Sequence, residues 1–322
     1  MTDILFIKLG ALGDVINTLP LAIRLKKHMD ARIHWLVAPL SYPLVSEHPD
    51  VDRVILFDKK KWRTSLAQVR QELKKEPFDM VLDLQRIFKS GLFAMSARAK
   101  RRIGFDRKRC KEMTHLFPFE RIPSADPLAH MLDQYLEFGT YLGVTDPEIT
   151  WNIPVKGQVP FDLPENYVVL NIGATKPANR WHPECFAELS EKIRNAFGFD
   201  CVLTGGPEDS GMARTISDMA KGRATNLVGK TTLHELKEVL FASKAVVSCD
   251  TGPMHFAVAL GKKVVALFGP SDPRRTGPYK GHVIQKNLSC CPCNAKTCDD
   301  PRCMTAITPD DVLQGLIKAL SD

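Results

Sequence analysis

Short apolar runs alternate with stretches of helical periodicity along this chain of 322 residues, and that alternation is what most limits its fold. In the first half the apolar runs are residues 4–7, 33–37, 54–57 and 80–84, and residues 66–75 form one of the helix-like stretches. Runs of this length predict buried strands. Strands that alternate with amphipathic helices predict an α/β fold, in which helices cover a parallel sheet.

The alternation stops at residues 153–164, a stretch that holds three prolines and Gly157, and then begins again. Strands are expected at residues 167–172, 200–204, 245–248 and 264–268, and helices at 185–197 and 233–242. We therefore expect two Rossmann-like domains, residues 1–157 and 158–322, with the last helix a candidate to pack back on the first domain. Folds of this kind bind ligands at the carboxyl ends of their strands, which predicts a site in a central cleft that both domains face.

The net charge of +7 is unevenly placed along the chain. Residues 1–157 hold 25 Lys and Arg against 19 Asp and Glu, whereas residues 158–322 hold 19 against 18. Most of the excess lies in two basic clusters, residues 59–63 and 100–109. These clusters form either a solvated face or a surface that attracts phosphorylated lipid. No nucleic-acid recognition motif accompanies them, so a nucleic-acid partner is not expected.

The sequence shows no membrane-spanning or secretory segment. No apolar run approaches the roughly 20 residues that cross a bilayer. The opening MTDILFIKLG is too short and too polar at its ends for a signal peptide. We therefore expect a cytoplasmic protein, with peripheral contact at the inner face of the cytoplasmic membrane as an option that its basic first half leaves open.

Nine cysteines in such a protein do not indicate a disulfide framework, because the cytosol keeps thiols reduced. Five of them form a cluster near the end of the chain: Cys290, Cys291, Cys293, Cys298 and Cys303. Four thiolates of this cluster could bind zinc, but the spacing lacks paired C-x-x-C motifs. Buried or weakly reactive thiols are the other interpretation, and no metal ligand is assigned.

Residues 246–255 read VVSCDTGPMH, an apolar strand that ends in DTGP and is followed by a predicted helix. Pro253 suits the first helical turn, where its missing N–H costs nothing. The backbone N–H groups of Thr251, Gly252 and Met254, together with the helix dipole, would form an anion site suited to a diphosphate. An ordinary helix cap is the alternative.

Two neighbours of this motif are also candidate binding residues. His255 would add a hydrogen bond or a positive charge, and Asp250 would orient a neighbouring base or cation. Another glycine-containing turn, LTGGPE at residues 203–208, follows an expected strand. Gly205 would bring the backbone close to a ribose, and Glu208 would accept hydrogen bonds from its hydroxyls. A plain turn is equally compatible, and the turn lacks the G-x-G-x-x-G spacing of a nicotinamide site.

Residues 171–181 form a third loop at the end of an expected strand. The hydroxyl of Thr175 would bond to a phosphate oxygen, and Lys176 or Arg180 would neutralise the charge of a departing diphosphate. Trp181 is expected to pack in the core.

Gly13 and Asp14 follow the first strand and its turn. A carboxylate at this position would take a proton from an acceptor hydroxyl during sugar transfer, and the dipole of the following helix would keep it ionised. Lys8, at the end of the strand, would hold an anionic part of the acceptor. A simple N-cap role for Asp14 is the alternative.

Four segments in this order resemble glycosyltransferase family 9, the bacterial lipopolysaccharide heptosyltransferases: IKLGALGDVINTLP, NRWHPECFAELS, DTGPMHFAVALG and LFGPSDPRRTGP. The resemblance covers nearly the whole chain. It departs from the family where His182 separates Trp181 from Pro183, since the family often has Lys or Arg followed directly by Trp-Pro.

The resemblance implies a GT-B architecture, in which the first domain binds the acceptor and the second binds ADP-heptose. It also implies an inverting single displacement that needs neither a metal nor another cofactor. Asp14 becomes the catalytic base, Arg180 the basic group beside the phosphates, and Thr251 and Gly252 the diphosphate ligands. Glu208 would reach the ribose, and His255 matches the histidine of the same motif.

The implied acceptor is the lipid A and core oligosaccharide at the inner membrane surface, and the implied donor is ADP-L-glycero-D-manno-heptose. Two alternatives remain open at this stage. A relative could use another nucleotide sugar or acceptor, or the chain could be a nucleotide or thiol sensor without turnover. The sequence does not identify the acceptor sugar or the oligomeric state.

Overall fold

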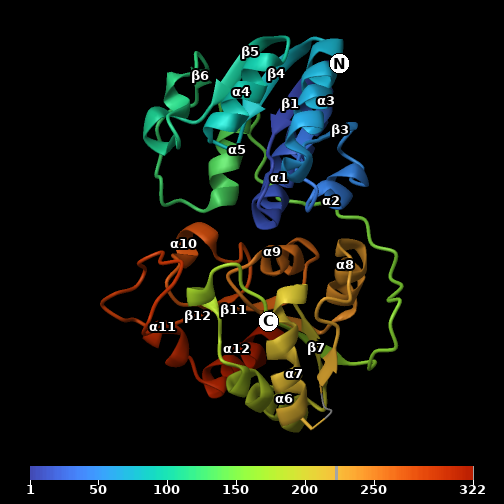
Figure 1. The fold of residues 1–322 in the computed structure, drawn as a ribbon, viewed down its shortest axis with the longest axis vertical. Helices are drawn as coiled ribbons and strands as arrows, with labels where there is room; N and C mark the ends of the chain where they lie inside the picture. The colour runs from blue at the N-terminus through green and yellow to red at the C-terminus, as the bar shows by residue number, and fades with distance from the viewer. Residues whose placement is uncertain (222–223, 322) are drawn as a thin grey trace. The chain divides into compact units, whose positions relative to one another are not determined.

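The computed structural model describes residues 1–221 and 224–321, and the chain divides into two compact units, Met1–Pro154 and Val155–Asp322. The division falls inside the proline-rich stretch that the sequence singles out. Each unit holds a six-stranded sheet in which all the strands that pair are parallel (Figure 1). The predicted α/β class with two parallel sheets is therefore confirmed.

The strands of the first unit are β1 (Thr2–Ile7), β2 (Ala31–Val37), β3 (Arg53–Leu56), β4 (Phe78–Asp83), β5 (Ala99–Gly104) and β6 (Glu120–Arg121). Its helices are α1 (Leu12–Met29), α2 (Tyr42–Ser46), α3 (Trp62–Lys75), α4 (Phe88–Ser96) and α5 (Met131–Tyr141), with 3-10 turns η1 (Lys59–Lys61), η2 (Arg107–Arg109) and η3 (Thr114–Leu116).

The strands of the second unit are β7 (Tyr167–Asn171), β8 (Asp200–Thr204), β9 (Ala224–Asn226), β10 (Ala245–Cys249), β11 (Lys263–Phe268) and β12 (His282–Gln285). Its helices are α6 (Pro183–Phe197), α7 (Ser210–Met219), α8 (Leu233–Ala242), α9 (Gly252–Ala259), α10 (Pro273–Thr276), α11 (Arg302–Thr305) and α12 (Pro309–Ser321), with 3-10 turns η4 (Pro177–Asn179) and η5 (Pro207–Asp209).

The two sheets have the same strand order. It is β3-β2-β1-β4-β5-β6 in the first unit and β12-β11-β10-β7-β8-β9 in the second. In each sheet the order reverses between the first and fourth strands, so β1 and β4 flank one reversal point and β7 and β10 flank the other. Doubly wound folds bind ligands at such a point, outside the carboxyl ends of the two strands. The fold therefore directs attention to the loops that follow these four strands.

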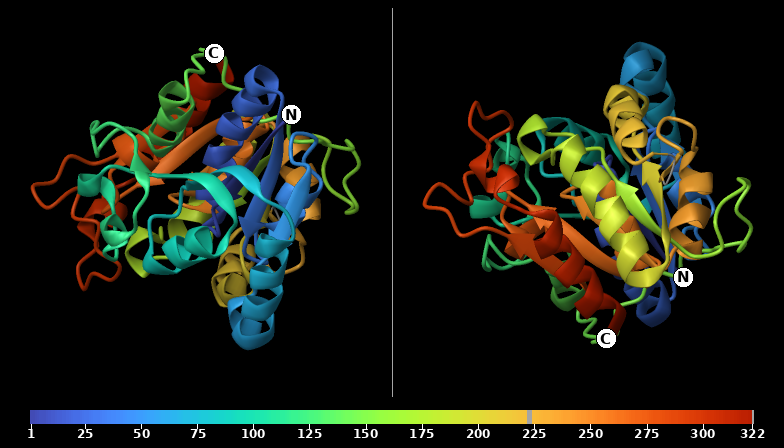
Figure 2. Two further views of the ribbon diagram at one scale, coloured as in Figure 1. Left: turned by 90° about the horizontal axis from the view of Figure 1, so that it is seen from above. Right: turned by 90° about the horizontal axis from the view of Figure 1, so that it is seen from below.

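Helices cover both faces of each sheet, which explains why the central strands are almost continuously apolar. Leu5 and Ile7 of β1 belong to a buried cluster that includes Val69 of α3 and Phe93 of α4. The alternate residues of β1 are buried as well, and α1 contacts both β2 and α5. In the second unit α12 lies beside α6 (Figure 2) and also contacts β11. The last helix thus buries its apolar face within its own unit.

The basic cluster at residues 100–109 is partly solvated and partly paired within the first unit. Much of it lies in strand β5 and turn η2, where Arg101 pairs with Glu120 at 2.6 Å. Arg109 is buried between Asp106 and Glu137. The charges of Arg101 and Arg109 are therefore neutralised within the unit, whereas Arg107 and Lys108 are exposed.

Candidate active site

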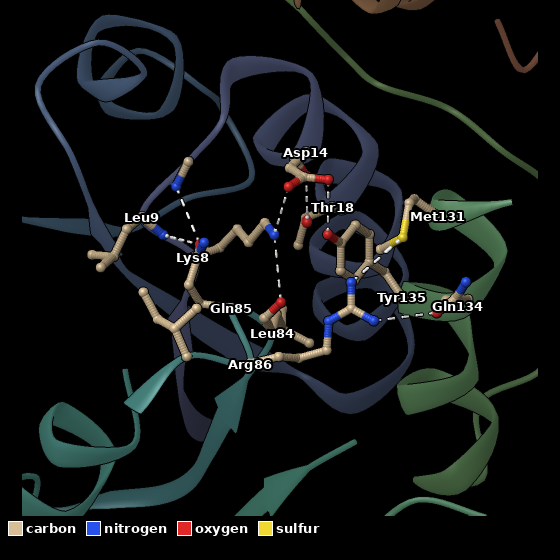
Figure 3. A network of polar contacts seen from close by, with 12 residues as sticks. Lys8, Leu9, Asp14, Thr18, Leu84, Gln85, Arg86, Met131, Gln134 and Tyr135 are labelled. Carbon is tan, nitrogen blue, oxygen red and sulfur yellow. Dashed lines mark hydrogen bonds and ion pairs between the residues drawn. The ribbon is translucent and has the colours of Figure 1, made fainter. Parts of the chain in front are cut away.

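Lys8 and Asp14 meet at the reversal point of the first sheet. Lys8 follows β1, and its Nζ lies 3.1 Å from Oδ2 of Asp14 and 3.4 Å from the carbonyl oxygen of Leu84, which follows β4 (Figure 3). The hydroxyl of Tyr135 on α5 donates to the other carboxylate oxygen of Asp14 at 3.1 Å. The sequence therefore brings together groups from two strand ends and two helices around one carboxylate.

Asp14 is not the N-cap of α1. Ala11 occupies the cap position, and Asp14 lies in the first helical turn, with Gly13 buried beside it. An acidic group in the first turn interacts favourably with the helix dipole. Because its two oxygens bond to Lys8 and Tyr135, the carboxylate is held in one orientation. The capping alternative for Asp14 is thus wrong, and a fixed carboxylate takes its place.

The electrostatic balance keeps Asp14 ionised. Burial acts to raise its pKa, but the charge and hydrogen bond of Lys8, helped by Arg86 and Tyr135, outweigh burial and leave the pKa below its ordinary value. Burial lowers the pKa of Lys8, whose side chain is 2% exposed, while Asp14 opposes that effect. The Asp14 side chain itself is 36% exposed, so an incoming hydroxyl can reach it.

Arg86 supplies a second buried cation at this point. Its guanidinium lies 4.6 Å from the ring centre of Phe105 and donates to Gln134 Oε1 at 3.5 Å. The backbone of Arg86 has a φ of 63°, in a left-handed region that residues other than glycine seldom occupy. Residues held in this region cluster at functional sites.

Thr251 occupies the corresponding point of the second sheet, after β10. It is the N-cap residue of α9, yet within the part of the chain that the structure describes its hydroxyl makes no capping bond. The hydroxyl instead accepts from Asn171 Nδ2 at 3.1 Å and lies 3.1 Å from the hydroxyl of Ser248. Asn171 is the last residue of β7, so this contact joins the two strand ends. Pro253 lies in the first turn, as expected.

Asp209 anchors the basic group of the neighbouring loop. Arg180 Nη2 lies 3.0 Å from Oδ1 of Asp209, and the N–H of Gly206 donates to Oδ2 at 3.0 Å. Asp209 is 2% exposed and Arg180 is 39% exposed, so the carboxylate is fixed inside while the guanidinium reaches solvent. A side-chain carbon at Gly173 would come within 2.6 Å of Asp209 Oδ2. This loop can pass beside Asp209 only because position 173 carries no side chain.

Glu208, the acidic residue that the sequence favoured in this turn, is exposed. Its carboxylate lies over Gly206, where an added side-chain carbon would meet it. Gly205 is half-buried, and its carbonyl oxygen accepts from the N–H of Gly229 at 3.1 Å. Asp209 is thus the acidic residue that organises the turn.

Asp250 follows β10 and contacts the loop after β7. Its Oδ2 accepts from Asn179 Nδ2 at 3.3 Å, and Asn179 also bonds to Ser271 at 3.2 Å. Burial raises the pKa of Asp250, while Ser271, the charge of Lys176 and Asn179 oppose the shift. Asp250 is thus hydrogen-bonded to the loop that carries Lys176 and Arg180.

The remaining predicted residues of the second unit differ in exposure. Thr175 is exposed, Lys176 and Gly252 are half-buried, and His255 is 8% exposed on α9. Trp181 is buried, and its indole N–H donates to the carbonyl oxygen of Ile307 at 2.9 Å. Trp181 thus packs in the core, as expected.

Residues 66–303 match the sequence profile of glycosyltransferase family 9 (heptosyltransferase), which covers more than half of the chain. The chain belongs to glycosyltransferase family 9. This confirms the family that the four sequence segments indicate, and with it a glycosyltransferase activity.

Known proteins resemble this family 9 glycosyltransferase over most of its length. The lipopolysaccharide core heptosyltransferase OpsX of Haemophilus influenzae is 27% identical over 85% of this chain and 80% of its own length. A solved family 9 glycosyltransferase from Veillonella parvula is 23% identical, covers 99% of this chain and 97% of its own, and has a TM-score of 0.83. The E. coli heptosyltransferase WaaC, solved with ADP, is 23% identical over 99% of this chain and 100% of its own, with a TM-score of 0.79. These likenesses confirm the predicted GT-B fold class.

Sequence reasoning missed three side chains of this glycosyltransferase's two strand-end sites: Arg86, Tyr135 and Asp209. Arg86 carried a usable signal, because it follows an apolar run as directly as Asp250 does. Asp209 stands next to Glu208, and only the conformation of η5 distinguishes the two. Tyr135 carried no usable sequence signal, since it lies 121 residues from Asp14 and reaches it through the packing of α5 on α1.

The cysteine-rich segment of the glycosyltransferase borders the loop that carries Arg180. The N–H of Ala178 donates to the carbonyl oxygen of Lys296 at 3.1 Å, and the N–H of Asn294 donates to that of Pro270 at 2.7 Å. Burial, with Cys303 and Cys290 beside it, raises the pKa of the Cys291 thiol to about 12. Residues 1–221 and 224–321 contain no group of three or more His, Cys, Asp or Glu side chains placed to hold a metal ion. Of the five thiols in this segment, those of Cys290, Cys293 and Cys298 are exposed, that of Cys291 is half-buried and that of Cys303 is buried.

Among residues 1–221 and 224–321, no helix is both long enough and apolar enough to cross a bilayer.

Proposed function

We propose that this glycosyltransferase transfers heptose from ADP-L-glycero-D-manno-heptose to the inner core of lipopolysaccharide. The names of its relatives support this assignment: they include lipopolysaccharide heptosyltransferases from Haemophilus influenzae and E. coli. Similar folds were also solved with ADP and with ADP-2-deoxy-2-fluoro heptose.

The single observation that carries the proposed mechanism is the ionised, two-point-held carboxylate of Asp14. In an inverting displacement the acceptor oxygen bonds to the anomeric carbon as the bond to the diphosphate breaks with its electron pair. The acceptor hydroxyl then passes its proton to Asp14. A positioned base of this kind contributes a factor of roughly 10² to 10⁴ in rate. Lys8 and Tyr135 keep the carboxylate charged and oriented.

The proposed donor site uses the loops of the second unit. The N–H groups at the start of α9, on Thr251 and Gly252, would bind the diphosphate, because a helix N-terminus favours anions. Arg180 would act as the second catalytic group by stabilising the charge that develops on the leaving ADP. The exposed guanidinium that Asp209 holds suits this role.

Six further residues are proposed to complete the donor site: Thr175, Lys176, Gly205, Glu208, Asp250 and His255. Of these, Lys176 adds positive charge beside the leaving group, and Asp250 positions the loop that carries it. Glu208 is exposed and would bind the ribose by turning toward it.

Lys8 and Gly13 are proposed to line the acceptor side of the reaction. The acceptor is a membrane lipid, so we place the enzyme at the cytoplasmic face of the inner membrane, without a spanning helix among the described residues. We further propose that the first unit binds the acceptor and the second binds the donor.

Donor screening tests the proposal. The purified full chain is incubated with deacylated inner-core acceptor and either ADP-heptose, ADP-glucose or UDP-glucose, and transfer is followed by mass spectrometry and by release of nucleotide. We expect transfer from ADP-heptose, with NMR of the product showing an inverted anomeric centre. Transfer from another nucleotide sugar alone would assign a different donor, and nucleotide binding without any transfer would leave a sensor role.

A further inference from the structure

We propose that a groove between α3 and α4 of the first unit docks on a bilayer that contains anionic phospholipid. The groove is a cavity of about 530 Å³, and α3 packs against α4 beside it. Its lining residues are Phe57, Lys59, Trp62, Leu66, Arg70, Phe88, Lys89, Leu92, Phe93, Ser96 and Glu112. Most of this lining is apolar or basic, and only one residue of it is acidic.

The apolar part of the groove is open to solvent. Trp62 is 54% exposed, Phe88 44% and Leu92 47%, whereas the floor of Phe57 and Phe93 belongs to the buried core. Large exposed apolar side chains gathered around a cavity mark an interaction surface. Trp62 is the first residue of α3, at the point where the basic turn η1 ends. The indole thus stands beside a run of lysines.

The basic part consists of five cations within residues 57–70: Lys59, Lys60, Lys61, Arg63 and Arg70. None of these five forms an ion pair within the described ranges 1–221 and 224–321. Two nearby carboxylates accept hydrogen bonds from main-chain N–H groups: Asp58, beside the lysine run, from Lys60 at 2.8 Å, and Glu112, in the lining, from Phe88 at 3.1 Å. Unlike the paired arginines of the 100–109 cluster, this group therefore keeps its charge available for a partner.

Charge complementarity selects the partner. Tryptophan concentrates at the interface between hydrocarbon and water, and basic side chains beside it are drawn to anionic head groups. With Trp62 at this interface, the apolar groove between α3 and α4 would admit the upper part of a lipid acyl chain. The occupant we commit to is therefore the surface of an anionic phospholipid bilayer, with Trp62 inserted and the lysines of η1 on the phosphates. This deepens the proposed membrane location, and vesicle binding is measured without donor or acceptor, so its failure is separate from a failure of sugar transfer.

Sedimentation with vesicles tests the surface. The full chain is mixed with vesicles of phosphatidylcholine, with or without phosphatidylglycerol, and bound protein is quantified. We expect binding only to the anionic vesicles. Replacing Lys59, Lys60 and Lys61 together by Gln should weaken partitioning about a hundredfold, because each cation near such a surface contributes about fivefold. The control Lys74→Gln, an exposed cation at the other end of α3, should change it less than about twofold.

Trp62→Ala should weaken partitioning by about tenfold through lost apolar burial. The control Ile317→Ala removes an exposed apolar side chain from α12 and should have little effect. Because Trp62 is exposed, its replacement should leave the thermal midpoint unchanged, which separates lost docking from lost folding.

Tryptophan fluorescence reports directly on the insertion of Trp62 into the bilayer. The other three tryptophans, Trp35, Trp151 and Trp181, are each 8% exposed or less. Phosphatidylcholine brominated in its acyl chains, mixed with phosphatidylglycerol, should quench Trp62 in the wild-type chain. The proposal is overturned if anionic vesicles do not bind the chain, or if they bind it without quenching and with Trp62→Ala unaffected. It is equally overturned if Trp62→Ala dissociates an oligomer in solution, since the groove would then be a contact between copies.

Discussion

Asp14→Asn is the change that tests the proposed chemistry most directly. Asparagine keeps the size of the side chain and an acceptor for Tyr135, but it removes the negative charge that faces Lys8. We expect kcat to fall by a factor of about 10² to 10⁴, which corresponds to roughly 2.7 to 5.5 kcal/mol in the barrier. The affinity for ADP should remain within about threefold, because the proposed diphosphate ligands lie in the second unit.

The same change also affects stability, and the amount follows from exposure. Removing one partner of a fully buried ion pair costs about 3 to 5 kcal/mol. Lys8 is 2% exposed but Asp14 is 36% exposed, so water screens part of the interaction. We therefore expect a loss of only about 1 to 2 kcal/mol in the free energy of unfolding. Urea unfolding measures this loss, and assays should be run where the variant stays folded.

Asp310→Asn is the matched control for Asp14→Asn. Asp310 also lies in the first turn of a helix and also pairs with a lysine, Lys192, at 2.8 Å, but it is 70% exposed and belongs to α12. Its replacement should cost less than about 1 kcal/mol and leave kcat unchanged. The reasoning fails if Asp14→Asn keeps kcat within tenfold of wild type, or if ADP affinity and transfer fall together.

Two further changes separate the two strand-end sites. Tyr135→Phe removes a hydrogen bond that favours the charged form of Asp14, so the pKa of Asp14 should rise. The acid limb of the pH profile of kcat/KM should then move to higher pH. An unchanged acid limb would show that Tyr135 does not act on the catalytic base. Gly173→Ala places a carbon 2.6 Å from Asp209 Oδ2, so it should displace Arg180 from Asp209. It should weaken ADP binding, measured by calorimetry, and lower the free energy of unfolding by about 1 to 3 kcal/mol. The control Gly211→Ala, where an added carbon has nothing within 4 Å, should change neither ADP binding nor stability.

The central strands could be predicted from the sequence because both of their faces are buried. The runs at residues 80–84 and 264–268 are nearly all apolar, and they correspond to β4 and β11. Strand β5, which lies between β4 and the edge strand β6, escaped because Lys100, Arg101 and Arg102 follow its first residue. The side chains of Arg101 and Arg102 make contacts with neighbouring segments rather than with a core. A pattern of charges alone does not reveal such contacts.

The residues of the candidate site also fall into those that the sequence could predict and those that it could not. Lys8, Asp250 and Thr251 were predictable because parallel strands bring their carboxyl ends to one edge of a sheet, so residues that follow apolar runs gather there. Tyr135 was not predictable, because its contact with Asp14 depends on how α5 packs on α1. The choice between Glu208 and Asp209 depends on a single 3-10 turn, a level of detail that residue type does not determine.

The contacts between residues 294–296 and the loops after β7 and β11 place a distinctive constraint on the end of the chain. Both hydrogen bonds, Ala178 to Lys296 and Asn294 to Pro270, join main-chain atoms only. These two bonds depend on the length of the stretch and not on the side chains of residues 294–296. A deletion there would release the turn next to Arg180, so natural variants of this segment should differ in composition far more than in residue number.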